Sequence, residues 1–216
     1  LSSARAAAKK LAAVIVPSEF TRKELLAINP TQSLPRKGRD QVIAIPHGYD
    51  SCYKKIADGG VVDEVLKKYG ITRPFFLSVG RLEEKKNTRR LIEAFNLFSD
   101  YRLRTTANKL NQPTTNYQLP TTNYQPAQGY QLVLVGSPGY GYEKIRQAID
   151  DSPHKDRIKE LGWLPTEDIV SLMNATTAFV FPSLYEGFGL PVLEAFACGA
   201  QVVAGRGSSL EEISED

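Results

Sequence analysis

The segment EGFGLPVLE, residues 186–194, places two carboxylates, Glu186 and Glu194, eight positions apart with Gly187 and Gly189 between them. Carboxylates accept hydrogen bonds from hydroxyl groups, glycines let a ligand approach the backbone closely, and a helix N-terminus offers free N–H groups to an anion. The combination suits a ligand that carries phosphates between two polyols. A nucleotide sugar has this build, with sugar, diphosphate and ribose in that order.

A second segment, VGRLEEKKN at residues 79–87, supplies the opposite charge. Gly80 ends an apolar run, and Arg81 and Lys86 follow it. The planar guanidinium of arginine binds two phosphate oxygens at once, whereas a lysine acts as a point charge. If both segments lie at one place, cations and helix N–H groups would stabilise a departing diphosphate without a cluster of metal ligands.

The elements that position these segments follow from short apolar runs that alternate with amphipathic stretches. The stretch 87–98 predicts a helix with Asn87 as N-cap, and the stretch 166–173 predicts one with Thr166 as N-cap. Apolar runs without polar alternation are typical of parallel strands covered on both faces. The strands are predicted at residues 12–16, 41–45, 75–79, 131–135, 177–181 and 200–204. The chain is therefore predicted to be an α/β protein with a Rossmann-like doubly wound parallel sheet.

The EGFG segment is predicted to follow the strand at 177–181 as a loop. A helix should come next, with Pro191 in its first turn and Gly199 just past its end. The two glutamates then lie at the carboxyl edge of the sheet, which is where open α/β sheets bind ligands.

Composition narrows the classes of partner. The 27 basic and 24 acidic residues leave a net charge of +3, which is too balanced to favour nucleic acid. Cys52 and Cys198 are far apart and belong to no metal-binding pattern, so we expect no metal and a reducing, cytoplasmic location. No apolar run is long enough to predict a transmembrane segment.

The stretch from about residue 104 to 128 interrupts the alternation. It contains PTTNYQ twice, at 113–118 and at 120–125, and few side chains that could enter a core. We predict a disordered low-complexity insertion between a helix and the next strand.

Several motifs together resemble the retaining GT-B glycosyltransferases of family 4, also called glycosyl transferases group 1. The segment at 181–199 matches the E-x7-E motif of that family and is highly specific. The motifs, in the family's order, are VPSEFTRKEL at 16–25, IPHGYD at 45–50, VGRLEEKKN at 79–87, LVLVG at 132–136, LGWLPTEDI at 161–169 and FPSLYEGFGLPVLEAFACG at 181–199.

The resemblance implies a role for each candidate residue. Glu186 would contact the donor sugar and, with Arg81 and Lys86, form the catalytic group, in which the two cations clamp the diphosphate. Glu194 would hold the ribose. The other donor-binding residues would be Gly80, Trp163, Leu164, Gly187, Phe188, Gly189 and Leu190.

The resemblance further implies a mannosyltransferase-like enzyme of polysaccharide biosynthesis, which needs no cofactor. It would move a hexosyl group from a UDP-, GDP- or ADP-sugar to a carbohydrate or lipid-linked acceptor, with retention through front-face attack. Residues 1–30 would be the last elements of the acceptor-binding N-terminal domain, and residues 31–216 the donor-binding C-terminal domain, truncated at its end. The isolated chain would be inactive, and the whole protein could associate peripherally with the inner face of a membrane.

Two other classes of function fit the sequence less well, and one stays open. The glycine loop at 136–142 is no P-loop, because Tyr142 and Glu143 stand where lysine and serine or threonine are needed. A glycosidase would need a general acid for a poor leaving group, whereas a nucleoside diphosphate leaves readily. A non-catalytic nucleotide- or carbohydrate-binding module remains the alternative.

Overall fold

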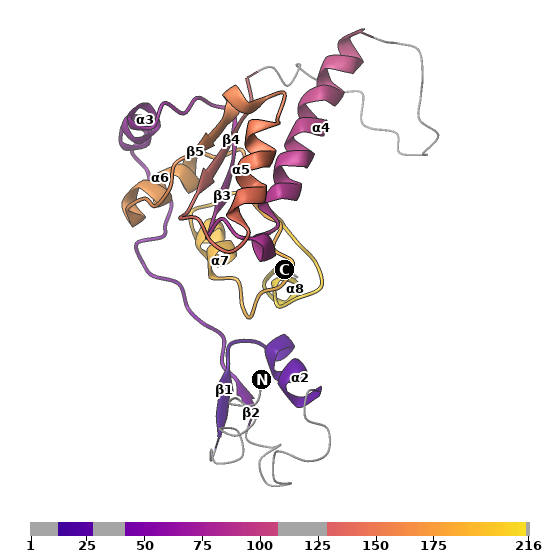
Figure 1. Cartoon of the computed structure of the whole chain (residues 1–216). Coiled ribbons are helices and arrows are strands. Elements are labelled where there is room, and N and C mark those ends of the chain that lie inside the picture. The colour runs from indigo at the N-terminus through magenta and orange to yellow at the C-terminus, as the bar shows by residue number, and fades with distance from the viewer. Residues whose placement is uncertain (1–12, 28–41, 108–128, 215–216) are drawn as a thin grey trace.

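The computed structural model describes residues 13–27, 42–107 and 129–214, which form a two-stranded and a five-stranded parallel sheet (Figure 1). The strands are β1 (Val14–Val16), β2 (Val42–Ala44), β3 (Phe75–Val79), β4 (Gln131–Val135), β5 (Ile158–Glu160), β6 (Ala178–Phe181) and β7 (Val202–Ala204). The α-helices are α2 (Glu19–Ala27), α3 (Gly59–Lys68), α4 (Thr88–Ala107), α5 (Tyr142–Asp150), α6 (Thr166–Ala175), α7 (Leu190–Ala197) and α8 (Leu210–Ser214). Two short 3-10 helices are η2 (Glu84–Lys86) and η3 (Lys155–Arg157).

The larger sheet has the strand order β5–β4–β3–β6–β7, and all of its pairs are parallel. In the central strand β3, Leu77 is in register with Val133 of β4 and with Phe179 of β6. The predicted doubly wound parallel sheet is thus confirmed. The sequence did not predict β5, because its three residues include two charged side chains and form no apolar run.

The core has two layers, one on each face of this sheet. Leu132 and Leu134 of β4 pack with α4 and α5, whereas Val133 and Val135 pack on the opposite face with α3, α6 and α7. Successive side chains of a strand point to opposite faces, so a continuous apolar run fills both layers. Figure 1 shows α4 and α5 side by side on one face of the sheet.

Two predicted helix caps differ from the structure. Helix α6 begins at Thr166, and Pro165 occupies the N-cap position without a side-chain cap, so the prediction of Thr166 as N-cap was wrong. The Pro165 carbonyl accepts from the N–H groups of Asp168 and Ile169 at 3.2 and 3.1 Å, which starts the helix one residue earlier. Asn87 does precede α4, but with φ 59° rather than the extended backbone of most N-caps.

The smaller sheet pairs β1 with β2, with Val14 in register with Val42. A parallel pair needs a crossover connection, and α2 lies within it. This pairing joins β2 to β1, so the change from one sheet to the other falls after Ala44.

Helix α4 continues to Ala107 and so includes the first residues of the stretch predicted as an insertion. Nothing in the segment 99–107 forces an end, since it contains neither glycine nor proline. The PTTNYQ repeats lie outside the described residues.

Candidate active site

The candidate residues meet where the order of the larger sheet reverses. Strands β3 and β6 are neighbours there, and the chain leaves β3 toward α4 but enters β6 from α6 on the opposite face. The carboxyl ends of strands beside such a switch point form the ligand crevice of open α/β sheets. The structure therefore brings the cationic segment after β3 next to the loop at residues 182–189, which we call the donor loop.

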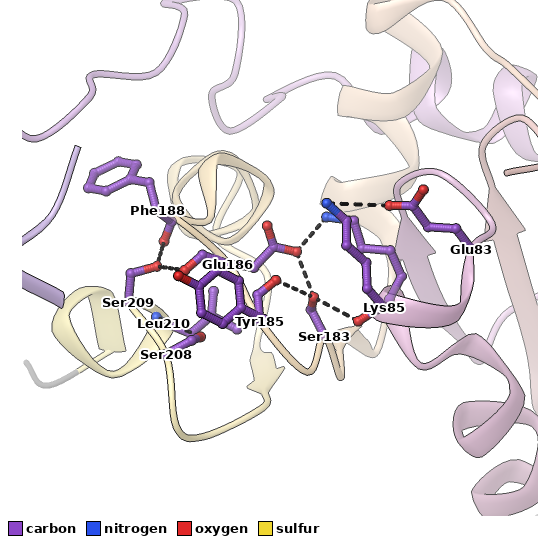
Figure 2. Close-up of polar contacts among 10 residues, drawn as sticks. Glu83, Lys85, Ser183, Tyr185, Glu186, Phe188, Ser208, Ser209 and Leu210 are labelled. Atoms are coloured by element: carbon purple, nitrogen blue, oxygen red, sulfur yellow. Dashed lines mark hydrogen bonds and ion pairs between the residues drawn. The ribbon is translucent and has the colours of Figure 1, made fainter. Parts of the chain in front are cut away.

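An ion pair joins the two segments. The ammonium group of Lys86 contacts Oε1 of Glu186, and their side chains are only 18% and 13% exposed. Ser183 is buried, and its hydroxyl donates to the same oxygen at 2.6 Å (Figure 2). Lys86 and Ser183 both contact Oε1, so Oε2 remains able to accept from a ligand. Nζ of Lys86 also lies 5.0 Å from the centre of the Phe181 ring.

Lys85, next in sequence, has a different environment. Its ammonium lies 3.5 Å from Glu83, and its side chain is 60% exposed. Lys85 thus lies in a solvated turn, whereas Lys86 lies beside the donor loop.

Glycines set the backbone around Arg81. Gly80 has φ 148° and donates its N–H to the carbonyl of Val135 at 2.9 Å. A Cβ at Gly139 would come within 3.0 Å of Cγ of Arg81, so the arginine stem lies directly over this glycine. Within the described ranges no carboxylate pairs with Arg81, and its exposed guanidinium is available to an anion.

Helix α7 begins at Leu190, directly after the donor loop. Gly189 occupies its N-cap with φ 109°, and a Cβ there would come within 2.4 Å of Cδ2 of Leu210. Pro191 lies in the first turn and Gly199 just past the end, as predicted. The N-terminus of α7, which is the positive end of the helix macrodipole, therefore faces the crevice.

Glu194 lies in the second turn of α7 in a partly desolvated environment. Burial raises the pKa of this carboxyl, and a hydrogen bond with Tyr53 acts in the opposite direction. Burial, followed by the negative charge of Glu194, raises the pKa of Tyr53 to about 12. Burial also raises the pKa of the Cys198 thiol to about 11. No local pattern indicates Tyr53, because it lies 141 positions before Glu194 in the sequence.

The raised pKa of Glu194 predicts a dependence of stability on pH. A group whose pKa is higher in the folded state stabilises the fold below its unfolded pKa, and this stabilisation is lost as the pH rises through the folded pKa. We expect wild type to lose stability relative to Glu194→Gln as the pH rises above the ordinary pKa of a glutamate. Thermal unfolding of both proteins checks this, and a difference in Tm that stays constant with pH would contradict it.

The two residues expected near the base differ in exposure. The Trp163 side chain is 75% exposed, whereas Leu164 is 5% exposed and packs in the core layer that contains Val170 and Met173. Only Trp163 of this pair presents its side chain at the surface.

Phe20 of α2 and His47, which follows β2, also touch the donor loop, and the sequence did not indicate these contacts. The rings of His47 and Phe188 meet edge to face with centroids 5.3 Å apart. The rings of Phe20 and Tyr185 do the same at 5.6 Å. The hydroxyl groups of Ser18, Thr21 and Ser209 also contact backbone carbonyls of the donor loop. No local spacing rule could have predicted them, because their partners are more than 20 residues away.

Within the part of the chain that the structure describes, no three His, Cys, Asp or Glu side chains come together as a metal site. Among the same residues no helix is both long enough and apolar enough to cross a membrane.

Sequence comparison shows the class to which this fold and site belong. The family model for glycosyl transferases group 1 matches residues 73–216, which include the whole larger sheet. The chain therefore belongs to the glycosyl transferases group 1 family.

Two curated relatives illustrate how far the similarity extends. The O-antigen chain mannosyltransferase B of Escherichia coli is 33% identical over 154 residues, which are 70% of this chain and 34% of that protein. The alpha-maltose-1-phosphate synthase of Mycolicibacterium smegmatis is 27% identical over 215 residues, 98% of this chain and 48% of that protein. The chain thus spans between a third and a half of the length of these relatives.

Solved structures agree on the fold. The Anabaena protein HepE, in complex with UDP and glucose, matches with a TM-score of 0.73 at 21% identity, over 100% of this chain and 50% of that one. The sucrose-phosphate synthase of Thermosynechococcus elongatus matches with a TM-score of 0.68 at 21% identity, over 98% and 45% of the two chains. These structural neighbours are GT-B glycosyltransferases, so the α/β architecture is that of this class.

Proposed function

We propose that this chain binds the nucleotide diphosphate sugar of a retaining GT-B glycosyltransferase of family 4, as the donor-binding C-terminal domain of a longer enzyme. The observation that carries the proposal is the meeting of Lys86, Glu186 and the N-terminus of α7 at the switch point between β3 and β6. This arrangement combines cations, a hydroxyl-binding carboxylate and free N–H groups in one crevice.

In this proposal Arg81 and Lys86 hold the diphosphate together with the backbone of Gly187 and Gly189. Oε2 of Glu186 accepts from a hydroxyl of the transferred sugar, because Oε1 is already engaged. As the bond between sugar and phosphate breaks, negative charge grows on the diphosphate and the cations stabilise it. The acceptor attacks from the same face as the leaving diphosphate, which gives retention of configuration.

The ribose and the base are assigned to the other end of the crevice. Glu194 accepts from ribose hydroxyls, and its partial burial strengthens such a hydrogen bond. The exposed ring of Trp163 is a surface for the base, while the buried Leu164 can contribute only its backbone. Phe188 and Leu190 line the sugar end, and Gly80 keeps the backbone before Arg81 open.

The transferred sugar is proposed to be a mannosyl or related hexosyl unit, because four relatives that match over 70% of this chain are mannosyltransferases. HepE is in complex with UDP and glucose, and uridine, guanosine and adenosine donors are all to be tested on this chain. A carbohydrate or lipid-linked acceptor would bind to the N-terminal domain of the longer enzyme, and peripheral contact with a membrane would bring a lipid-linked acceptor within reach.

The alternative is a module that binds a nucleotide or carbohydrate without catalysis. The partly buried Lys86–Glu186 pair favours the enzyme over a module that binds carbohydrate alone, because breaking a phosphate–sugar bond needs a cation beside the leaving group, whereas sugar binding does not.

The proposal predicts that the two glutamates affect different ligands. Glu194→Gln should weaken the binding of a nucleoside diphosphate and of its nucleotide sugar alike, because both contain the ribose. Glu186→Gln should leave the nucleoside diphosphate unaffected and weaken only the nucleotide sugar. A hydrogen bond to a charged group contributes about 1.5–3 kcal/mol, so each loss should exceed about tenfold in calorimetric titrations.

Glu64→Gln is the control, because Glu64 is exposed in α3, away from the donor loop. If both variants weaken the bare nucleoside diphosphate equally, the division of roles between the two glutamates is wrong. If wild type binds none of UDP, GDP, ADP and their sugars, the donor site itself is refuted.

A further inference from the structure

Three successive carbonyl groups of the donor loop contact side-chain hydroxyls from distant parts of the chain. The Gly187 carbonyl accepts from Ser18 at 2.8 Å and from Thr21 at 2.9 Å. The hydroxyl of Ser209 lies 2.8 Å from the carbonyl of Glu186 and 3.0 Å from that of Phe188, as Figure 2 shows. We call Ser18, Thr21 and Ser209 the hydroxyl clamp.

The clamp residues are themselves held in place. Ser18 is 2% exposed and Ser209 is fully buried. The Ser18 hydroxyl also accepts from the Thr21 N–H at 3.0 Å, as an N-cap does, and fixes the first turn of α2. The carboxylate of Glu212, in α8, accepts from the N–H groups of Glu19 and Phe20 at the same helix end. The hydroxyl groups of the clamp are therefore held in fixed positions beside the donor loop.

Fixing a carbonyl also fixes the N–H group that follows it. In a planar trans peptide the C=O and the next N–H point in opposite directions. Holding these carbonyls thus turns the N–H groups of Gly187 and Gly189 away from Ser209, and that of Phe188 away from Ser18 and Thr21. Among the described residues no acceptor is found for these three N–H groups. They lie immediately before the N-terminus of α7, where the first N–H groups of the helix also lack intrahelical acceptors.

We infer that Ser18, Thr21 and Ser209 are positioning residues, which orient the N–H groups of Gly187, Phe188 and Gly189 to bind the diphosphate of the donor. The inference rests on the proposed function, because it assigns the clamp to the same crevice. The inference adds that α2, the helix that connects the two strands of the smaller sheet, contributes to phosphate affinity without touching the ligand. A row of backbone N–H groups with fixed direction is a strong anion site, and a freely rotating glycine loop is not.

The test compares ligands with and without phosphates. UDP, GDP, ADP and the three corresponding nucleosides are titrated by calorimetry against wild type and against the Ser18→Ala/Thr21→Val double variant. The double variant is expected to bind the diphosphates about tenfold more weakly and the nucleosides within about twofold of wild type. Thr21→Ser, which keeps the hydroxyl, should retain wild-type affinity, and the exposed Lys23→Ala in the same helix serves as control.

Each result has one interpretation. If wild type binds a diphosphate and the double variant binds it equally well, the clamp is refuted while the proposed function stands. If wild type binds no diphosphate, the proposed function fails. If circular dichroism shows that the double variant does not fold, Thr21→Val alone, which keeps the Ser18 cap, decides. It should weaken diphosphate binding about threefold while Thr21→Ser does not, and equal affinities for these two variants refute the clamp.

Discussion

Replacing Lys86 with alanine is expected to lower the free energy of unfolding by about 3–5 kcal/mol. The substitution leaves the carboxylate of Glu186, which is only 13% exposed, without its cation. A charge that water reaches poorly costs more when its partner is removed than when the whole pair is replaced. Chemical denaturation of wild type and variant measures the difference directly.

Two further variants show whether the ion pair is the cause. Lys85→Ala should change stability by less than about 1 kcal/mol, because Lys85 is exposed and pairs with Glu83 at the surface. Adding Glu186→Gln to Lys86→Ala should recover most of the lost stability, because it removes the unpaired charge. A double variant no more stable than Lys86→Ala would show that the loss has another origin.

The same Lys86 variants separate stability from function. If Lys86 clamps the diphosphate, the loss of binding should persist in the stabilised double variant. In the full-length enzyme the loss of one such cation is expected to reduce the stabilisation of the transition state by about 2.7–4 kcal/mol, by analogy with the loss of one oxyanion donor. Arg81→Ala should have a comparable effect on ligand binding, but little effect on stability, because Arg81 is exposed.

Gly136→Ala is expected to destabilise the fold by at least about 3 kcal/mol. Gly136 follows β4 with φ 146°, a conformation that is essentially restricted to glycine. A Cβ at this position would lie 2.0 Å from the carbonyl oxygen of Gly80. Because the obstacle is backbone at the end of the neighbouring strand β3, no side-chain rotation can relieve it. The variant should therefore shift Gly80 and Arg81 as well as lose stability.

Gly162→Ala is the matched control. Gly162 has φ 68° and nothing within 4 Å of the added carbon, so only the cost of the left-handed backbone remains, at about 1–2 kcal/mol. Thermal and chemical unfolding of both variants give the comparison. If the two substitutions cost the same, the close approach of β3 and β4 at Gly80 does not limit residue 136.

Much of the fold could be predicted because it depends on neighbouring residues. Strands β3, β4 and β6 are apolar runs, and α7 starts beside Pro191 and ends before Gly199, which are local signals. Even the meeting of Lys86 with the donor loop followed from a general rule, since parallel strands end at one edge of a sheet. Strand β5 was missed because tertiary pairing with β4, and not its own composition, makes it a strand.

The sequence by itself determined which chemistry is available: two glutamates around a glycine loop, cations after a strand, and the alternation of strand and helix that places both at one edge. Only the tertiary structure decided that Ser183 and Lys86 share Oε1 of Glu186. It also placed Tyr53 beside Glu194. The hydroxyls of Ser18 and Thr21 likewise reach the Gly187 carbonyl only through the tertiary fold. The physical reason is range. A turn or a helix end is set by interactions over a few residues, whereas a contact between Ser18 and Gly187 depends on how two sheets and the chain between them pack.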